Sequence, residues 1–417
     1  MQDGFLLNFY TSISSLKARA IFKLYVMAES LLTKQYIAQA IENIQKLISY
    51  PSITPDHHGC LDYLINWLKK HGFVFEKISK GGVDNLIAYK KFDNDGPNFA
   101  FAGHIDVVPA DELSWKHPPF SGVISEGKLY GRGAVDMKGS IGCFMSATES
   151  VLKTLKKGTL YWLLTCDEEG EAEFGTKIMV EALNKKGIAL DYCLVGEPTA
   201  TSKVGDVIKV GRRGAISAKI NFSGKAGHVA YPLLADNALH KAVNFSNQLL
   251  QFPWYLGTQH QPGNTLQITY LTTSDFTDNI VPPQAELCFN IRFNSSFDLE
   301  EFKSKTINLL HSIDPHARIL WQRLCIPYQT VCEAGKESFT DLVSSCIQEL
   351  FDMQPSLSIS GGTSDGRFIA NQSTQVIELG PSNKTIHQIN ENISISEISD
   401  LFHLYKKILI KIHSEHQ

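Results

Sequence analysis

Two kinds of hydrophobic pattern alternate along most of the chain. Short and almost uninterrupted apolar runs occupy residues 98–102, 160–165, 192–195 and 375–379. Between them, apolar residues recur at helical spacing, which predicts helices over 140–155 and 175–184. Nearly continuous apolar strands separated by helices are typical of a sheet that is covered on both faces. The pattern therefore predicts an α/β fold.

Two amphipathic helices are expected before the first of these strands. One covers residues 30–49 and ends at Tyr50-Pro51, because a proline ring cannot continue a helix. The other covers 60–70 and ends at His71-Gly72, where glycine suits the position that caps a helix C-terminus. We assign both helices to the α/β part of the chain.

The middle of the chain has a different order of elements. It reads as strand, helix, strand, strand, helix and strand over residues 215–222, 237–251, 265–272, 285–293, 299–313 and 318–324. This β-α-β-β-α-β order is that of the split βαβ, or ferredoxin-like, motif. We therefore predict a compact domain over 214–326 that interrupts an α/β domain formed by 28–213 and 327–417.

The first 27 residues are predicted to lie outside the fold. A charge-free and fairly apolar stretch, residues 4–16, precedes Lys17 and Arg19. A secretory signal carries its positive charge before the apolar segment, whereas here only Asp3 comes first. We interpret residues 1–27 as an extension rather than as an export signal.

Composition and charge exclude several classes of protein. Of the 417 residues, 43% are apolar and 20% are charged, which is ordinary globular usage. The net charge of −4 gives no overall basic field for nucleic acid. No uncharged apolar run reaches the ~18 residues of a membrane-spanning helix, so we expect no membrane partner. The eight cysteines form no CxxC pair and lie mostly in apolar runs, which favours reduced thiols and a cytoplasmic location.

Potential metal ligands follow each of the four apolar runs. They are His104 and Asp106 after the first run, Asp167, Glu168 and Glu169 after the second, Glu197 after the third and His387 after the fourth. A further acid, Asp136, lies in a glycine-rich loop that opens a helix. Ligands of open α/β sheets bind beyond the carboxyl ends of the strands. We therefore expect these side chains to converge on one rim of the sheet.

The residue types at this rim point to metal ions. A single acid after a strand most often caps a helix, but several acids in one place repel each other unless cations lie between them. Imidazole and carboxylate ligands together suit zinc or a neighbouring first-row ion. Two histidines with at least three carboxylates exceed what one zinc ion needs, which favours a two-metal site with a bridging carboxylate.

Five motifs at these positions resemble a known family. They are Gly-His-Ile-Asp-Val-Val-Pro (103–109), Gly-Arg-Gly-Ala-Val-Asp-Met-Lys-Gly (131–139), Asp-Glu-Glu (167–169), Gly-Glu-Pro (196–198) and His-Gln-Ile-Asn-Glu (387–391). Together they are similar to the dinuclear zinc amidohydrolases that include aminoacylases, acetylornithine deacetylase and carboxypeptidase G. The resemblance implies a zinc-exopeptidase-like catalytic domain with a mixed, largely parallel sheet, interrupted by an inserted ferredoxin-like dimerisation (lid) domain.

The resemblance also implies roles for the rim residues. His104 and Glu197 would hold one zinc ion, Glu169 and His387 the other, and Asp136 would bridge the two. Asp106 would orient His104, and Glu168 would be the general base. The implied cofactor is two Zn²⁺ per subunit, with Co²⁺ or Mn²⁺ able to substitute at one site.

Three further stretches narrow the resemblance. Residues 211–214, 227–232 and 360–368 look like those of the desuccinylases in this family that cleave N-succinyl-LL-2,6-diaminopimelate. The substrate contacts implied by this resemblance are Arg212, Tyr231, Asn279, Arg292, Gly362, Thr363 and Asn383. The resemblance further implies a homodimer in which His228 reaches the partner's scissile carbonyl.

Two arginines agree with such a substrate, whereas one residue and one loop depart from the pattern. A small molecule with several carboxylates needs fixed cations, and the guanidinium groups of Arg212 and Arg292 match carboxylates better than lysine does. Ala215 stands where the pattern has a serine, and the loop 170–175 is unusually acidic. Two alternatives remain open: a related deacylase or peptidase, and a non-catalytic binding protein on the same fold.

Overall fold

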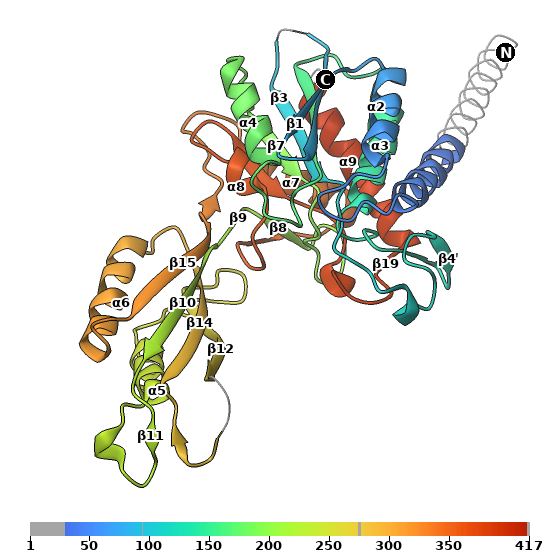
Figure 1. The fold of residues 1–417 in the computed structure, drawn as a ribbon. Coiled ribbons are helices and arrows are strands. Elements are labelled where there is room, and N and C mark those ends of the chain that lie inside the picture. Colours follow the sequence, from blue (N-terminus) through green and yellow to red (C-terminus); the bar gives the residue numbers. More distant parts are fainter. Residues whose placement is uncertain (1–29, 94, 274–276, 415–417) are drawn as a thin grey trace, which may run out of the picture.

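The structure is a computed structural model, and it describes residues 30–93, 95–273 and 277–414. The predicted extension, residues 1–27, lies outside the described part of the chain. Within the described part, no helix combines the length and the hydropathy needed to span a bilayer. Figure 1 shows two lobes, each built around its own β-sheet.

The larger lobe contains an eight-stranded sheet with the strand order β1-β2-β6-β3-β7-β18-β8-β17. The strands are β1 (Val74–Lys80), β2 (Val83–Lys91), β3 (Asn98–His104), β6 (Thr159–Thr165), β7 (Tyr192–Val195), β8 (Val207–Lys209), β17 (Ser356–Ser358) and β18 (Gln375–Glu378). The four neighbours β6, β3, β7 and β18 run parallel to one another. β1 and β2 pair antiparallel at one edge, and β8 is antiparallel to β18, so the sheet is mixed.

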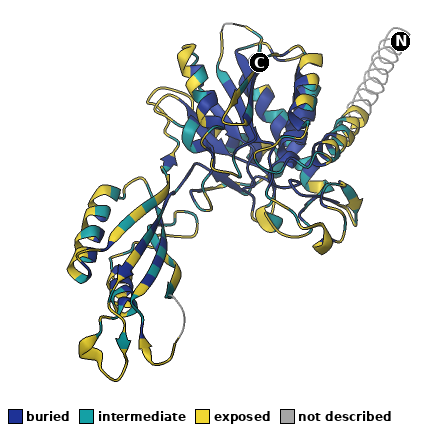
Figure 2. Cartoon of the chain, in the orientation of Figure 1, coloured by how far each residue is buried: buried dark blue, intermediate teal, exposed yellow. Residues whose placement is uncertain are grey.

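Alternating residues of the central strands face two separate helix layers. Phe99, Phe101 and Trp162 pack in the largest apolar cluster, while Ala100 and Leu163 pack in another. The first cluster includes the helix over residues 30–48, α2 (Cys60–Lys70), α3 (Lys138–Val151), α7 (Phe339–Phe351) and α9 (Ile395–His413); the second includes α4 (Thr176–Lys185) and α8 (Gly366–Ile369). The central strands are therefore buried on both faces, as the sequence predicts, and Figure 2 shows this buried core in dark blue.

The smaller lobe is built on a four-stranded antiparallel sheet with the order β12-β14-β10-β15. Its elements are β10 (Gly214–Ser223), α5 (Ala238–Leu250), β12 (Thr265–Thr273), β14 (Gln284–Phe293), α6 (Leu299–Ile313) and β15 (Arg318–Cys325). The chain order is strand, helix, strand, strand, helix, strand, with the first and third strands at the centre, which is the ferredoxin-like arrangement. Both helices pack on an apolar core that is separate from the core of the larger lobe.

Short elements complete the fold. Two two-stranded sheets pair β9 (Gly211–Arg212) with β16 (Tyr328–Gln329) and β11 (Gly227–His228) with β13 (Ile280–Val281), and a three-stranded sheet joins β4 (Val123–Ser125), β5 (Lys128–Tyr130) and β19 (Asn392–Ser394). The 3₁₀ turns are η1 (Glu112–Ser114), η2 (Pro232–Leu234) and η3 (Asn383–Thr385). The β9–β16 pair is the place where the chain leaves the larger lobe and returns to it.

Candidate metal centre

The carboxyl ends of the four parallel strands carry the predicted ligands. His104 is the last residue of β3, Glu168 and Glu169 follow β6, and Glu197 follows β7. His387 comes after β18 and η3, in a backbone conformation with φ 57°. Because neighbouring parallel strands end at the same edge, all of these side chains lie on one rim of the sheet.

Asp136 lies at the centre of this group. It is buried in the loop before α3, and its two carboxylate oxygens face different histidines. Oδ1 lies 2.9 Å from Nε2 of His104, and Oδ2 lies 3.2 Å from Nε2 of His387. A carboxylate that presents one oxygen to each of two imidazoles has the orientation of a bridging ligand.

Two further carboxylates complete two sets of ligand atoms. Oε1 of Glu197 lies 3.5 Å from Nε2 of His104, and Oε1 of Glu169 lies 2.9 Å from Nε2 of His387. The sets His104–Asp136–Glu197 and Asp136–Glu169–His387 each bring their ligand atoms within 4.8 Å of one another. The structure thus brings together the five residues predicted as ligands, in the predicted division into two sets.

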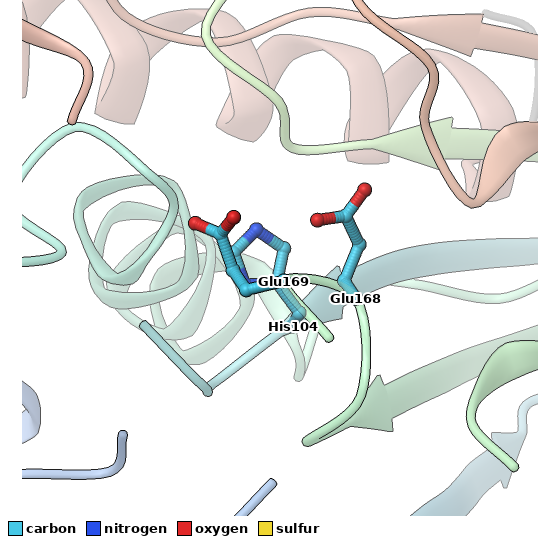
Figure 3. A group of neighbouring side chains, drawn as sticks. All are labelled: His104, Glu168 and Glu169. Atoms are coloured by element: carbon cyan, nitrogen blue, oxygen red, sulfur yellow. The ribbon is translucent and has the colours of Figure 1, made fainter. Parts of the chain in front are cut away.

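Glu168 lies beside these sets rather than within them. Figure 3 shows the carboxylates of Glu168 and Glu169 on either side of the His104 ring. Together with His104 they form a third group whose ligand atoms lie within 4.8 Å. A carboxylate adjacent to the ligands is in position to exchange a proton with a molecule bound at the centre.

Asp106 supports the centre in a way that the sequence does not reveal. Nδ1 of His104 donates to the main-chain carbonyl of Asp106 over 2.9 Å, while the Asp106 carboxylate lies 3.6 Å from that nitrogen. This bond leaves Nε2 of His104 free for a ligand. The Asp106 carboxylate instead accepts the main-chain N–H groups of Glu168 (3.4 Å) and Glu169 (3.1 Å). Asp106 therefore positions the predicted base and a predicted ligand as well as His104.

The electrostatics of the rim indicate a site for cations. Burial and the charge of Asp136 raise the pKa of Glu197 to about 7. Hydrogen bonds that His387 donates to Asp136 and Glu169 raise the pKa of His387 to about 10. Although burial alone would lower it, hydrogen bonds to Asp136 and Glu197 also raise the pKa of His104. A group of side chains that binds protons this strongly carries more negative charge than it can hold without cations, so the donor set fits two divalent metal ions.

A buried glutamate that the sequence analysis leaves without a role holds the loop of Asp136 in place. The Glu391 carboxylate accepts the main-chain N–H groups of Gly133, Val135 and Asp136 over 3.0, 2.8 and 3.1 Å. It also pairs with Arg132 over 2.9 Å. Glu391 ends the same motif that contains His387, so one segment carries a predicted ligand and also supports the loop of Asp136, the predicted bridging residue. Its position in that motif is the signal that could have revealed it.

A cavity of about 580 Å³ adjoins the centre. Glu168 and Glu169 line it together with the acidic segment 170–173, Thr363 and the end of β15. Among the predicted substrate contacts, Thr363 thus lines the same cavity as Glu168. Asn383 begins η3, just before His387. A larger cavity of about 690 Å³ lies by β1, β2 and α4 and includes none of the predicted site residues.

The other predicted contacts are not among the residues that line the cavity beside the metal centre. Gly227–His228 forms β11, which Figure 1 places at the far end of the smaller lobe, with Tyr231 and Asn279 nearby. Arg292 lies on β14, where its Nε donates to Asn290 over 3.1 Å. The guanidinium of Arg212 is buried and pairs with Glu378.

Comparison with known proteins identifies the group to which the chain is related. The sequence profile of Peptidase family M20/M25/M40 matches residues 100–411. The chain belongs to this family. Solved structures with a similar fold include the aminopeptidase PepT of Bacillus cereus (TM-score 0.75, 19% identity, 90% of this chain and 98% of that one). Another is the YXEP protein of Bacillus subtilis, a dinuclear metal-binding peptidase from the M20 family (TM-score 0.65, 16% identity, 91% of this chain and 99% of that one).

Relatives with higher sequence identity align with about nine-tenths of the chain. Succinyl-diaminopimelate desuccinylase 1 of Alteromonas mediterranea is 45% identical over 379 residues, which cover 90% of this chain and 97% of the relative. Succinyl-diaminopimelate desuccinylase 2 of Shewanella loihica is 42% identical over 375 residues, covering 88% of this chain and 99% of the relative. The predicted resemblance to this family is confirmed.

Proposed function

We propose that the protein hydrolyses N-succinyl-LL-2,6-diaminopimelate to succinate and LL-2,6-diaminopimelate, a step of diaminopimelate and lysine biosynthesis. The observation that carries the proposal is the joint presence of both ligand sets and the adjacent base on the rim of the sheet. The identity to desuccinylases over about nine-tenths of the chain supports the choice of substrate. We place the reaction in the cytoplasm, in keeping with eight cysteines that are all free.

The proposed cofactor is a pair of zinc ions, one of which Co²⁺ or Mn²⁺ can replace. His104 and Glu197 would hold one ion, Glu169 and His387 the other, and Asp136 would bridge them. Zinc ions bound there would polarise the scissile carbonyl and lower the pKa of the attacking water. Mixed imidazole and carboxylate donors, with Nε2 of His104 left free by its other nitrogen, support this assignment.

The protein's own groups would carry the proton transfers. Glu168 takes a proton from the attacking water and delivers it to the nitrogen of the leaving amine. The Asp106 carboxylate keeps Glu168 in place by accepting a hydrogen bond from the main-chain N–H of Glu168. His228 donates a hydrogen bond to the oxyanion that forms at the scissile carbonyl.

The proposed substrate contacts recognise carboxylate and amine groups. Arg212 and Arg292 supply fixed positive charge for carboxylates, because their forked donors match a carboxylate group. The remaining contacts in the proposal are Tyr231, Asn279, Gly362, Thr363 and Asn383. The position of Thr363 on the cavity that also contains Glu168 supports its inclusion.

The proposal includes a homodimer formed by an inserted domain. Residues 214–326 would form this dimerisation and lid domain between the catalytic segments 28–213 and 327–417. A separate sheet and a separate apolar core support the division. The distance of His228 from the metal centre of its own chain supports a role for that residue in the partner's site. Exposed apolar side chains beside it, such as Leu233 at 98% exposure, suit a surface that a second copy covers.

A direct test compares three substrates with zinc-loaded protein. We expect efficient hydrolysis of N-succinyl-LL-diaminopimelate and little hydrolysis of N-acetylornithine or of a dipeptide. Steady-state kcat/KM for each substrate gives the preference. If only N-acetylornithine or only the dipeptide is cleaved efficiently, the protein is still a hydrolase but the proposed substrate is wrong. Ala215 would then be the first residue to examine. Absence of hydrolysis with every substrate would favour a binding protein.

A further inference from the structure

A buried carboxylate at the junction of the lobes has a cluster of donors around it. Glu378, the last residue of β18, is fully shielded from solvent. Its Oε2 accepts from Nε of Arg212 over 2.8 Å and from Nη2, and its Oε1 accepts the hydroxyls of Tyr328 and Ser364. Charged and neutral donors on both oxygens fix such a carboxylate strongly. We call Glu378, Arg212, Tyr328 and Ser364 the hinge cluster.

The hinge cluster joins both chain segments that connect the two lobes. Arg212 belongs to β9, which leads into β10, and Tyr328 belongs to β16, which follows β15. The two residues face each other in the β9–β16 pair. Figure 1 shows β9 at the junction of the lobes. Because Glu378 bonds to one residue of each segment, it ties the exit and the return of the chain to the central sheet.

The glycine-rich loop over residues 360–366 is built around the same cluster. Nη1 of Arg212 donates to the carbonyl of Ser360 over 3.0 Å. A Cβ atom at Gly361 would collide with that Nη1, and one at Gly366 would collide with the Tyr328 hydroxyl. These two glycines therefore make room for the arginine and the tyrosine. The loop carries Gly362 and Thr363, so the hinge cluster also sets where those residues lie.

The negative charge of Glu378 also stabilises the protonated form of Arg212. Burial alone would lower the pKa of Arg212, but the Glu378 carboxylate raises it, and Glu197 contributes in the same direction. Arg212 is thus within electrostatic range of a metal ligand. Three of the five guanidinium N–H groups bond to Glu378 and Ser360, which leaves two for a bound carboxylate.

We propose that Glu378 is the positioning residue for the carboxylate-binding part of the site. It holds Arg212 and the 360–366 loop in the arrangement that receives a substrate carboxylate, and it fixes both to the two strands that connect the lobes. This inference rests on the proposed function, because Arg212, Gly362 and Thr363 are substrate contacts only under that function. A prepared arginine binds a carboxylate without first losing side-chain freedom, so the effect of Glu378 is on substrate binding.

The test replaces Glu378 by an uncharged side chain of the same size. For Glu378→Gln we expect KM for N-succinyl-LL-diaminopimelate to rise about tenfold or more, because charge-assisted hydrogen bonds to Arg212 are lost. We expect kcat to change by less than about threefold and the bound metal to be unchanged. The inhibition constant of free succinate should rise in parallel with KM, and hydrogen exchange of the 360–366 amides should become faster.

A matched control separates positioning of substrate from general damage. Glu391 is also a fully buried glutamate of the larger lobe that pairs with an arginine. Glu391→Gln should weaken metal binding about 10–100-fold, measured by titration calorimetry, because it loosens the loop of Asp136. It should leave exchange of the 360–366 amides unchanged. Equal changes in the two variants would show that any buried glutamate gives the same effect and would overturn the inference.

Two milder substitutions test the same role if the Glu378→Gln variant does not fold. Tyr328→Phe and Ser364→Ala each remove one hydroxyl from the hinge cluster and should each raise KM by a smaller factor, with kcat retained. An unchanged KM in all the variants, or a fall in kcat alone, would refute the role of Glu378. A wild-type protein that does not cleave the succinyl substrate would refute the proposed function instead, while the exchange measurement would still report whether Glu378 holds the loop.

Discussion

At the scale of single residues, the metal centre depends on side chains and main-chain groups that serve two purposes at once. His104 uses Nδ1 to bond to the Asp106 carbonyl and presents Nε2 to Asp136 and Glu197. Asp136 offers one oxygen to each histidine. The Asp106 carboxylate holds the main chain of Glu168, the proposed base, and of Glu169, a proposed ligand. Each of these groups is therefore sensitive even to an isosteric substitution.

The general base provides the clearest prediction at this scale. Glu168→Gln removes the proton acceptor and keeps the size of the side chain, so we expect kcat to fall about 10²–10⁴-fold. The variant should still bind two metal ions, because Glu168 lies outside both ligand sets. Steady-state assays give kcat, and elemental analysis of the same sample gives the number of bound metal ions. Glu181→Gln, an exposed glutamate of α4, is the matched control and should retain full activity. Full activity in Glu168→Gln would contradict the mechanism.

At the scale of secondary-structure elements, the apolar pattern locates the centre of the fold and misses its edges. The runs at 98–102, 160–165, 192–195 and 375–379 become β3, β6, β7 and β18, because buried strands are apolar along their whole length. β1 and β2 contain charged residues and were not predicted. β8 and β17 have three residues each, which is too short for a pattern to appear.

The end of α3 shows how distant contacts override a local pattern. The sequence predicts a helix to residue 155, but α3 ends at Val151. The main-chain N–H groups of Lys156 and Lys157 donate to the carbonyl of His413, at the end of α9.

The hinge cluster also depends on contacts between distant parts of the sequence, since Arg212 and Glu378 are 166 positions apart. Four of the proposed ligands could be predicted because each follows a central strand, and Asp136 because it lies in a recognisable motif. The pairing of Arg212 with Glu378 could not be predicted in this way.

The contact between α9 and the segment after α3 predicts a dependence of stability on pH. Burial lowers the pKa of His413 to about 4, while Nδ1 donates to the Lys157 carbonyl. The folded state thus resists protonation of His413, whereas the unfolded chain accepts the proton near pH 6.5. The stabilisation is complete above pH 6.5 and is lost as the pH falls towards 4, by about 3 kcal/mol in total.

The variant His413→Asn isolates this dependence, because it keeps a donor for the Lys157 carbonyl and does not titrate. Urea unfolding of both metal-free proteins between pH 4 and pH 8 gives the two free-energy curves. We expect the free energy of unfolding of the wild type to fall more steeply below pH 6.5 than that of the variant. Parallel curves would show that His413 is protonated equally in the folded and unfolded states.

At the scale of the whole molecule, the proposed active site needs more than one lobe and more than one chain. The metal centre belongs to the larger lobe, Arg292 to the sheet of the smaller lobe, and His228 to its far end. An arrangement of this kind makes activity depend on how the lobes and the subunits are placed. It also makes the origin of each residue testable by mixing inactive proteins.

The mixing test uses Glu168→Gln and His228→Ala, each expected to be nearly inactive alone. If His228 acts in the partner's site, a mixed dimer contains one complete site, with Glu168 from one subunit and His228 from the other. Random exchange of subunits then restores about a quarter of the wild-type activity. Activity is measured after the two proteins are dissociated and reassociated together. No recovery from a mixture in which mixed dimers are shown to form would place His228 in the site of its own chain.

The pairing of β9 with β16 has a consequence for how such proteins can be rebuilt. The chain enters and leaves the smaller lobe through two adjacent hydrogen-bonded strands, so the ends of the intervening segment lie side by side. A segment with neighbouring ends can be exchanged as a cassette without stretching the host chain. We expect chimaeras that join this larger lobe to the smaller lobe of a relative, with crossovers at these strands, to fold when residues 212 and 328 are kept with Glu378. Recombination at the same two points offers a simple route by which one hydrolytic core acquires different substrate-facing lobes.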